Sequence, residues 1–326
     1  MYQSIPKSKL GRTSLEVTRL GYGTGGKFVR SSALGNQKLW QLLLNQVLDS
    51  GINYIDTSND YGVRLLPIEL RCPSEEMIGK YISHRRSEYY LATKSGCTPD
   101  GPHVWTRENV FRGLHESLKR MRTDYVDVMQ YHLPSPQDVE IGNLVEALQD
   151  MRMQGKVRWI GVSTSLPDLA TFLEWDVFDV FQLPYSALDR EHEDWITKAS
   201  NSGAGIVIRG GVAQGERSRD NASSKEISDI GLGLSSISWD KYYEAELDDL
   251  RDNSETRTTF LMRYTLSHPH AHTNIVGTSK IHHLNENIVG IKKGPLSADV
   301  YDEVQRRLNI LGVTPDPIDR KILSDS

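Results

Sequence analysis

Short runs of β-branched and aromatic residues alternate along the chain with longer segments of helical periodicity. Eight of these runs predict strands, at residues 19–22, 53–55, 89–93, 126–131, 157–162, 180–183, 205–208 and 274–276. Strands that alternate regularly with helices are typical of βα units around a parallel sheet. Eight such units in succession favour a barrel over an open doubly wound sheet. We therefore predict an α/β protein with a (β/α)8 TIM barrel.

Several helical segments between the strands have recognisable ends. Residues 36–50 form one candidate helix, which Gly51 would stop. Thr106 is a plausible N-cap for a second helix, because its hydroxyl can accept a hydrogen bond from a backbone N–H of the first turn. The pattern predicts a third helix over 137–154 and a later one over 296–311. Each of these helices would cover the barrel with its apolar face.

The segments outside the eight repeats predict additions to the barrel. Residues 9–18 alternate in polarity around a turn at Gly11, which predicts a β-hairpin that could plug the barrel floor. The insertion at 63–73 and the Gly- and Ser-rich stretch at 210–238 predict long loops on the C-terminal face, where barrel active sites form. We expect one barrel domain over the whole chain, 1–326, with a loosely held tail at 311–326.

Composition narrows the possible functions. The 326 residues include 38 Lys and Arg against 43 Asp and Glu, a net charge of −5, so no basic surplus favours nucleic-acid binding. The two cysteines, Cys72 and Cys97, provide neither a disulfide framework nor a recognisable metal-binding spacing. No apolar run predicts a signal peptide or a membrane span. We expect a soluble, cytoplasmic protein, and the sequence leaves its oligomeric state open.

Four polar residues at the C-terminal ends of three consecutive predicted strands are candidates for catalysis: Asp56, Tyr61, Lys94 and His132. Side chains at these positions point into the mouth of a barrel and can converge. A buried lysine pairs with a carboxylate, and a phenol beside the ammonium group should have a lowered pKa. We therefore expect Tyr61 to donate a proton near neutral pH, while a neutral His132 orients a carbonyl.

Several motifs around these residues give the chain a resemblance to the aldo-keto reductase family, from about residue 10 to residue 287. The matching segments are KLGRT at 9–13, LGYGTG at 20–25, GINYIDT at 51–57, DYG at 60–62 and GKVRWIGVS at 155–163. By this resemblance Tyr61 is the general acid and base, Lys94 and Asp56 tune it, and His132 positions the substrate carbonyl. The family binds NADP(H) without a Rossmann GxGxxG fingerprint, which this chain also lacks.

The resemblance also implies a set of cofactor contacts spread over several strand ends. They are Gly23, Thr24, Gly25, Asp56, Ser163, Thr164, Gln182, Arg209, Gly210, Gly211, Gly277, Thr278, Ser279, Lys280, His283, Glu286 and Asn287. For the segment from Gly277 to Asn287, the alternative to cofactor binding is simple helix capping, with Ser279 as N-cap. For Arg209 the alternative is a structural ion pair.

Three of these positions depart from the family pattern. Many members carry Asn where this chain has Thr164, an aromatic residue where it has Arg209, and Arg or Gln where it has His283. An arginine recognises a phosphate with two parallel hydrogen bonds, which a histidine cannot reproduce. Lys280 and Thr278 could partly compensate, so NADP is favoured and NAD remains possible.

The substrate is a small carbonyl compound or alcohol by the same resemblance. Phe28 and Trp105, together with Tyr61 and His132, are the candidate substrate contacts. Two other readings stay open, one of which is a cofactor-sensing regulatory protein on the same barrel. The other is a dehydrogenase that works mainly in the oxidative direction on a sugar or polyol.

Two remaining features carry no predicted function. His268, His270 and His272 alternate just before the last predicted strand, which places them at the face of the barrel opposite the chemistry. We interpret this run as a solvated turn and predict no metal site. Cys97 lies near Lys94 in sequence, and we interpret it as an ordinary loop thiol.

Overall fold

The computed structural model describes residues 4–25, 37–62, 73–98, 102–213, 215 and 238–318. Eight parallel strands close a barrel in the order β10-β3-β4-β5-β6-β7-β8-β9. The strands are β3 (Leu20–Gly23), β4 (Tyr54–Asp56), β5 (Tyr90–Ser95), β6 (Val126–His132), β7 (Val157–Ser163), β8 (Val180–Pro184), β9 (Gly205–Arg209) and β10 (Thr273–Val276). The predicted fold is confirmed, and every predicted strand boundary lies within two residues of the observed one.

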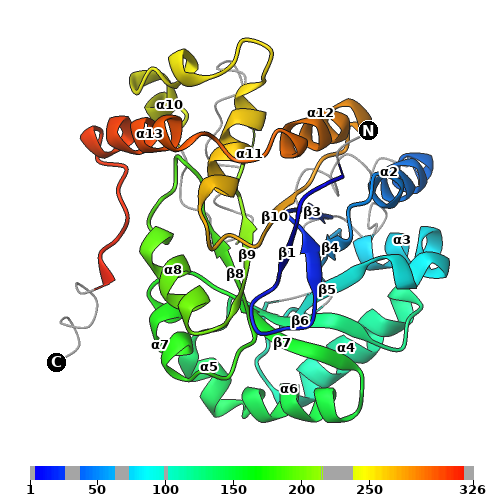
Figure 1. Cartoon of the computed structure of the whole chain (residues 1–326). Helices are drawn as coiled ribbons and strands as arrows, with labels where there is room; N and C mark the ends of the chain where they lie inside the picture. The colour runs from blue at the N-terminus through cyan, green and yellow to red at the C-terminus, as the bar shows by residue number, and fades with distance from the viewer. Residues whose placement is uncertain are drawn as a thin grey trace.

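Helices surround the barrel (Figure 1). They are α2 (Gln37–Asp49), α3 (Ser74–Tyr81), α4 (Arg107–Met121), α5 (Pro136–Ile141), α6 (Leu144–Met153), α7 (Asp168–Glu174), α8 (Glu193–Asn201), α10 (Asp240–Glu244), α11 (Arg257–Ser267), α12 (Ile281–Lys292) and α13 (Ala298–Ile310). Two 3-10 helices, η2 (Ser83–Glu88) and η4 (Leu247–Leu250), complete the set in the described chain. Within the described ranges, no helix has both the length and the apolarity that a membrane span requires.

The helices pack on the barrel through apolar faces. In α2, Trp40, Leu43, Leu44 and Val47 are fully buried, at the spacing of one helix face, while Leu42 is exposed. This helix fulfils the prediction for residues 36–50. The N-cap prediction is also confirmed, because the Thr106 hydroxyl accepts a hydrogen bond from the backbone N–H of Asn109, at 3.3 Å.

The single helix predicted over 137–154 is wrong. The structure has two helices, α5 and α6, separated by Gly142 and by Asn143, whose φ is +49°. At this break the chain lies so close to the preceding loop that a Cβ on Gly142 would be 2.6 Å from the carbonyl oxygen of Trp105. Hydrophobic periodicity continues across the break, which is why the sequence pattern did not reveal it.

The predicted N-terminal hairpin is present as β1 (Lys7–Lys9) paired antiparallel with β2 (Glu16–Thr18), and Figure 1 shows it across one end of the barrel. Three hairpin side chains pack into the barrel interior and form one buried apolar cluster with residues of five barrel strands. The hairpin residues are Leu10, Leu15 and Val17, and the strand residues are Tyr54, Ala92, Val128, Val180 and Val207. In the turn, Gly11 has φ +54°, and a Cβ there would lie 2.2 Å from the backbone nitrogen of Gly205. The hairpin therefore plugs the floor of the barrel, as predicted.

The three alternating histidines do not form the solvated turn that we predicted. The side chain of His268 is only 4% exposed, with Nε2 at 3.3 Å from the carbonyl oxygen of Glu193. Nδ1 of His272 accepts a hydrogen bond from the backbone N–H of Ile206, at 2.9 Å. Burial lowers the pKa of both rings to about 4. These histidines hold backbone groups at the N-terminal side of the barrel.

Parts of the predicted loops lie outside the described residues. They include Phe28, residues 63–72 of the insertion, residues 214 and 216–237 of the long loop, and residues 319–326 of the tail.

Candidate active site

The structure brings together the four candidate catalytic residues at the C-terminal end of the barrel. Asp56 ends β4, Lys94 lies near the end of β5, and His132 ends β6. Tyr61 lies in the loop that follows β4, where its backbone N–H donates to the carbonyl oxygen of Ser58, at 3.3 Å. The mouth of the barrel is thus opposite the hairpin floor, where active sites of this architecture occur.

Lys94 is fully buried, and all three donors of its ammonium group are used. Nζ lies 2.5 Å from Oδ1 of Asp56, 3.0 Å from the carbonyl oxygen of Thr57 and 3.3 Å from the hydroxyl of Tyr61. Burial by itself lowers the pKa of Lys94, but the attraction of Asp56 and the contact with Tyr61 outweigh it, so the pKa is raised. The ammonium group therefore remains charged beside the phenol.

The second carboxylate oxygen of Asp56 is also satisfied. Oδ2 accepts hydrogen bonds from Nε2 of Gln182, at 2.8 Å, and from Nε2 of Gln130, at 3.2 Å. Oε1 of Gln182 in turn accepts from the hydroxyl of Ser163, at 3.3 Å. Our sequence reasoning gave no role to Gln130. Strand alternation was the available signal, because Gln130 and His132 are two residues apart on one face of β6.

The structure contradicts the prediction that the pKa of Tyr61 lies below its ordinary value. Burial raises the pKa of Tyr61 to about 12, and the neighbouring Lys94 only partly offsets that rise. Lys94 therefore limits the increase instead of producing a net decrease. Tyr61 remains protonated at physiological pH, which makes it a proton donor and a poor proton acceptor.

His132 is 5% exposed and packs edge to face on Tyr61, with ring centroids 6.0 Å apart. Burial lowers the pKa of His132 to about 3, against the opposing influence of Asp60, whose Oδ1 lies 3.7 Å from Nδ1. The ring is therefore neutral at physiological pH. A neutral imidazole can orient a polar substrate atom without adding a charge to the site.

Asp60 is a second residue that our sequence reasoning left without a role, although it directly precedes Tyr61. Its carboxylate accepts hydrogen bonds from the hydroxyl of Ser58, at 2.5 Å, and from the thiol of Cys97, at 3.4 Å. Burial raises the pKa of Asp60, but His132 and the two hydrogen bonds outweigh burial and lower it. Cys97 is only 3% exposed, so it is a buried group of the site and differs from the ordinary loop thiol that we predicted.

The glycines expected to contact the cofactor lie beside the catalytic side chains. A Cβ on Gly25 would lie 2.8 Å from the ring of Tyr61, and one on Gly277 would lie 2.7 Å from the carbonyl oxygen of Gly23. The hydroxyl of Thr24 is fully buried and donates to the carbonyl oxygen of Asp56, at 3.1 Å. The two glycines thus allow the Tyr61 ring and the Gly23 carbonyl group to pack directly against the main chain.

Arg209 at the end of β9 is 9% exposed and extends toward the end of β7, where Nη2 donates to the carbonyl oxygen of Thr164, at 3.4 Å. Burial lowers the pKa of Arg209 to about 10, so it stays charged and acts electrostatically on Tyr61 and His132. The following Gly210 has φ +73°. A Cβ on Gly211 would lie 2.5 Å from the side chain of Asn274.

The segment from Gly277 to Asn287 connects β10 to α12. The carbonyl oxygen of Thr278 accepts from the hydroxyl of Tyr22, at 2.7 Å, and the Thr278 hydroxyl accepts from the backbone N–H of Lys280, at 3.1 Å. Lys280 is the N-cap residue of α12 and makes no side-chain cap, so the alternative with Ser279 as N-cap is wrong. Of the predicted contacts, those with exposed side chains are Lys280, His283 and Glu286, while Ser279 is half-buried and Asn287 is buried.

Trp105, a predicted substrate contact, lies next to the catalytic group. Its ring centroid is 5.2 Å from that of His103, which is 5.9 Å from that of His132. The indole ring lies against Gly96, where a Cβ would be 2.2 Å from it. Phe28, the other predicted contact, is among the residues that the structure does not describe.

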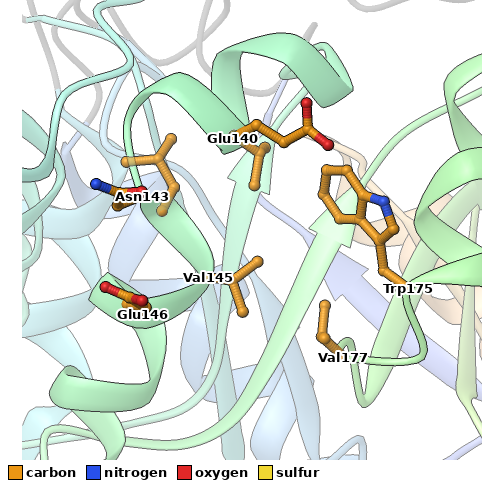
Figure 2. A pocket seen from close by; sticks show the side chains of 8 residues that line it. Glu140, Asn143, Val145, Glu146, Trp175 and Val177 are labelled. Carbon is orange, nitrogen blue, oxygen red and sulfur yellow. The ribbon is translucent and has the colours of Figure 1, made fainter.

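A separate groove lies on the outer wall of the barrel, between α5, α6 and the segment after α7 (Figure 2). It is lined by Val139, Glu140, Asn143, Leu144, Val145, Glu146, Trp175 and Val177. None of the four catalytic candidates lines it, so it is distinct from the barrel mouth.

Several known proteins are similar to this chain over most of its length. The chain is 29% identical over 292 residues to "Uncharacterized oxidoreductase YqkF" of Bacillus subtilis, covering 86% of this chain and 90% of that protein. It is 26% identical over 305 residues to L-galactose dehydrogenase of Arabidopsis thaliana, covering 86% of each. The holo form of the aldo-keto reductase AKR11C1 from Bacillus halodurans shares the fold, with a TM-score of 0.74, 24% identity and coverage of 94% of this chain and 96% of that one. The model of the aldo/keto reductase family matches residues 19–309, and the chain belongs to this family.

Proposed function

We propose that the protein is an NAD(P)(H)-dependent oxidoreductase that interconverts the carbonyl group of a small molecule with the corresponding alcohol. The observation that carries the proposal is a pair of contacts of the buried Lys94 at the C-terminal end of the barrel. Its Nζ lies 2.5 Å from Asp56 Oδ1 and 3.3 Å from Tyr61 OH. This arrangement presents one phenolic proton at the mouth, beside a fixed positive charge that stabilises the phenolate left after proton transfer. The scarcity of cysteine suits a reducing, cytoplasmic setting.

The chain's own residues handle the proton in this proposal. A bound nicotinamide nucleotide supplies the hydride. Tyr61 OH gives its proton to the oxygen that was the carbonyl oxygen, and Lys94 stabilises the phenolate that is left. This transfer is favourable even with the pKa of Tyr61 at about 12, because an alkoxide is a stronger base than a phenolate. Neutral His132 donates a hydrogen bond that orients the carbonyl oxygen toward Tyr61.

We assign the cofactor to the barrel mouth because the catalytic side chains lie there and because the start of α12 exposes polar side chains. Lys280 and His283 are both exposed there. A helix N-terminus with nearby cations favours a phosphate group. NADP is therefore the preferred nucleotide, and NAD is the second choice.

The L-galactose dehydrogenase relative favours a second candidate, a dehydrogenase that mainly oxidises a sugar or polyol. The raised pKa of Tyr61 argues for the reductive direction, because little phenolate is present at pH 7 to accept the proton of an alcohol. A comparison of initial rates with NADPH plus an aldehyde and with NAD⁺ plus a sugar alcohol separates the two directions.

The test is a fluorescence titration of the wild type and Tyr61→Phe with NADPH and NADH, together with reduction of 4-nitrobenzaldehyde. We expect both proteins to bind the nucleotide and the variant to turn over roughly 10² to 10⁴ times more slowly, the usual contribution of a positioned acid. Equal turnover by the variant would contradict the role of Tyr61. If the wild type binds neither NADPH nor NADH, the oxidoreductase assignment is overturned. If the wild type binds a nucleotide but shows no turnover, a cofactor-sensing protein is favoured.

A further inference from the structure

Three side chains of metal-ligating type gather beside the catalytic residues at the mouth. Cys97, His103 and His132 each offer one ligand atom, and these atoms lie within 4.8 Å of one another. Cys97 and His103 face each other in an antiparallel bridge after β5. His132 reaches the same point from the end of β6. The five residues that separate Cys97 from His103 match no familiar metal-binding spacing, so the fold alone brings these groups together.

Asp60 completes the cluster from the loop after β4. Its Oδ2 lies 3.4 Å from Sγ of Cys97, and its Oδ1 lies 3.7 Å from Nδ1 of His132. Around a tetrahedral zinc ion, with metal–ligand bonds of about 2.0 to 2.3 Å, neighbouring ligand atoms are roughly 3.3 to 3.8 Å apart. Asp60 makes these two contacts with different carboxylate oxygens, so one of the oxygens would become a ligand after a rotation of the carboxylate. The ligand atoms of Cys97, His103 and His132 lie within 4.8 Å of one another, and a movement of about 1 Å would bring them to the tetrahedral spacing.

The surroundings also suit a bound cation. Cys97 is 3% exposed, His132 is 5% exposed and the side chain of Asp60 is 10% exposed, so a metal ion here would be well shielded from water. Nδ1 of His132 is buried and makes no hydrogen bond with any residue that the structure describes. An imidazole nitrogen in this state can accept a metal ion without losing a hydrogen bond.

We propose that Cys97, His103, His132 and Asp60 form a site for a divalent cation of the zinc class at the barrel mouth. One thiolate, two imidazoles and one carboxylate make a donor set that zinc prefers over magnesium or calcium. Binding displaces the thiol proton of Cys97 to solvent. The ion would place a divalent charge on the ring that packs against Tyr61 and orients the carbonyl, so we expect it to inhibit substrate turnover. The inhibition rests on the proposed function, whereas the binding site does not.

Cobalt(II) added to the reduced protein without nucleotide tests the site directly, because a cobalt–thiolate bond gives an intense charge-transfer absorption. We expect this band in the wild type, with stoichiometric displacement by zinc. Cys97→Ala should lose the band, and His103→Ala should bind cobalt at least tenfold more weakly. The matched control is Cys72→Ala, which removes the chain's other thiol and should keep the band. Circular dichroism of each variant checks that it is folded.

Two outcomes would overturn the site: absence of the band in the wild type, or a band that survives in Cys97→Ala or disappears in Cys72→Ala. Turnover then separates this proposal from the proposed function. We expect zinc to inhibit the wild type reversibly, with relief by a chelator, and the zinc concentration for half inhibition to rise at least tenfold in Cys97→Ala and His103→Ala. A cobalt band without any wild-type turnover would refute the reductase alone, and normal turnover without a band would refute the metal site alone.

Discussion

The floor and the mouth of the barrel are built by the same strands and have opposite chemistry. On five strands an inward-facing apolar residue of the floor is followed two positions later by a polar residue of the mouth. The pairs are Tyr54 and Asp56, Ala92 and Lys94, Val128 and Gln130, Val180 and Gln182, and Val207 and Arg209. Because side chains alternate along a strand, each pair occupies successive layers of the interior. One step along the barrel axis therefore separates the apolar plug from the buried charges.

The two layers are also stabilised differently. The floor depends on the close packing of the hairpin against apolar side chains, which is not directional. The mouth depends on a connected set of hydrogen bonds around Lys94 and Asp56, in which each group satisfies another. Substitutions at the floor should therefore reduce the free energy of unfolding without reducing turnover. Substitutions at the mouth should reduce both.

The largest effect is expected from Lys94→Met at the mouth. The change leaves the buried carboxylate of Asp56 without its counter-ion, which should reduce the free energy of unfolding by about 3 to 5 kcal/mol and abolish turnover. The double variant Lys94→Met with Asp56→Asn should recover part of the stability but none of the activity. Urea unfolding followed by tryptophan fluorescence measures the stability of each variant, and aldehyde reduction measures its turnover. Equal stability of the single and double variants would contradict the ion-pair explanation.

At the floor, Gly11→Ala should reduce the free energy of unfolding by roughly 2 to 4 kcal/mol, because it adds strain at positive φ and pushes a Cβ against the backbone of Gly205. The matched control is Gly51→Ala, with φ +86° and no neighbouring atom within 4 Å, which should lose only about 1 kcal/mol. Turnover per folded molecule should not change in either variant. A large loss of turnover in Gly11→Ala would contradict the separation of floor and mouth.

The sequence was sufficient to predict the strands and the barrel, because every strand is a short run with clear boundaries. It was also sufficient to place Asp56, Tyr61, Lys94 and His132 at one end of the barrel, since strand ends in a parallel barrel share a face. These predictions depend on local patterns and on topology, both of which the order of residues determines directly.

The predictions that failed depend on distances between segments. The pKa of Tyr61 results from a balance between burial and Lys94, which only a packed structure defines. The break at Asn143 accompanies a close approach to the Trp105 carbonyl. The meeting of Cys97 with His103 depends on an antiparallel bridge between the two residues. None of these contacts leaves a periodic signal in the sequence.

The third prediction compares buried histidines on the two sides of the barrel. The folded pKa is about 3 for His132 at the mouth and about 4 for His268 near the floor, whereas an unfolded histidine has a pKa near 6.5. Below pH 6.5 the unfolded chain binds protons that the folded chain does not bind. The free energy of unfolding therefore falls as the pH falls toward the pKa values of the folded state. Each ring should account for a loss of about 2 kcal/mol between pH 8 and pH 5.

Urea unfolding at pH 8 and pH 5 measures this loss in the wild type and in His132→Gln and His268→Gln. Each substitution should reduce the pH-dependent loss by about 2 kcal/mol, because glutamine binds no proton in either state. The control His84→Gln alters an exposed ring and should leave the loss unchanged. Only His132→Gln should also slow aldehyde reduction, because His268 is remote from the mouth. An unchanged loss in both variants would show that other groups govern acid unfolding, and an equal fall in turnover would contradict the division between the two ends of the barrel.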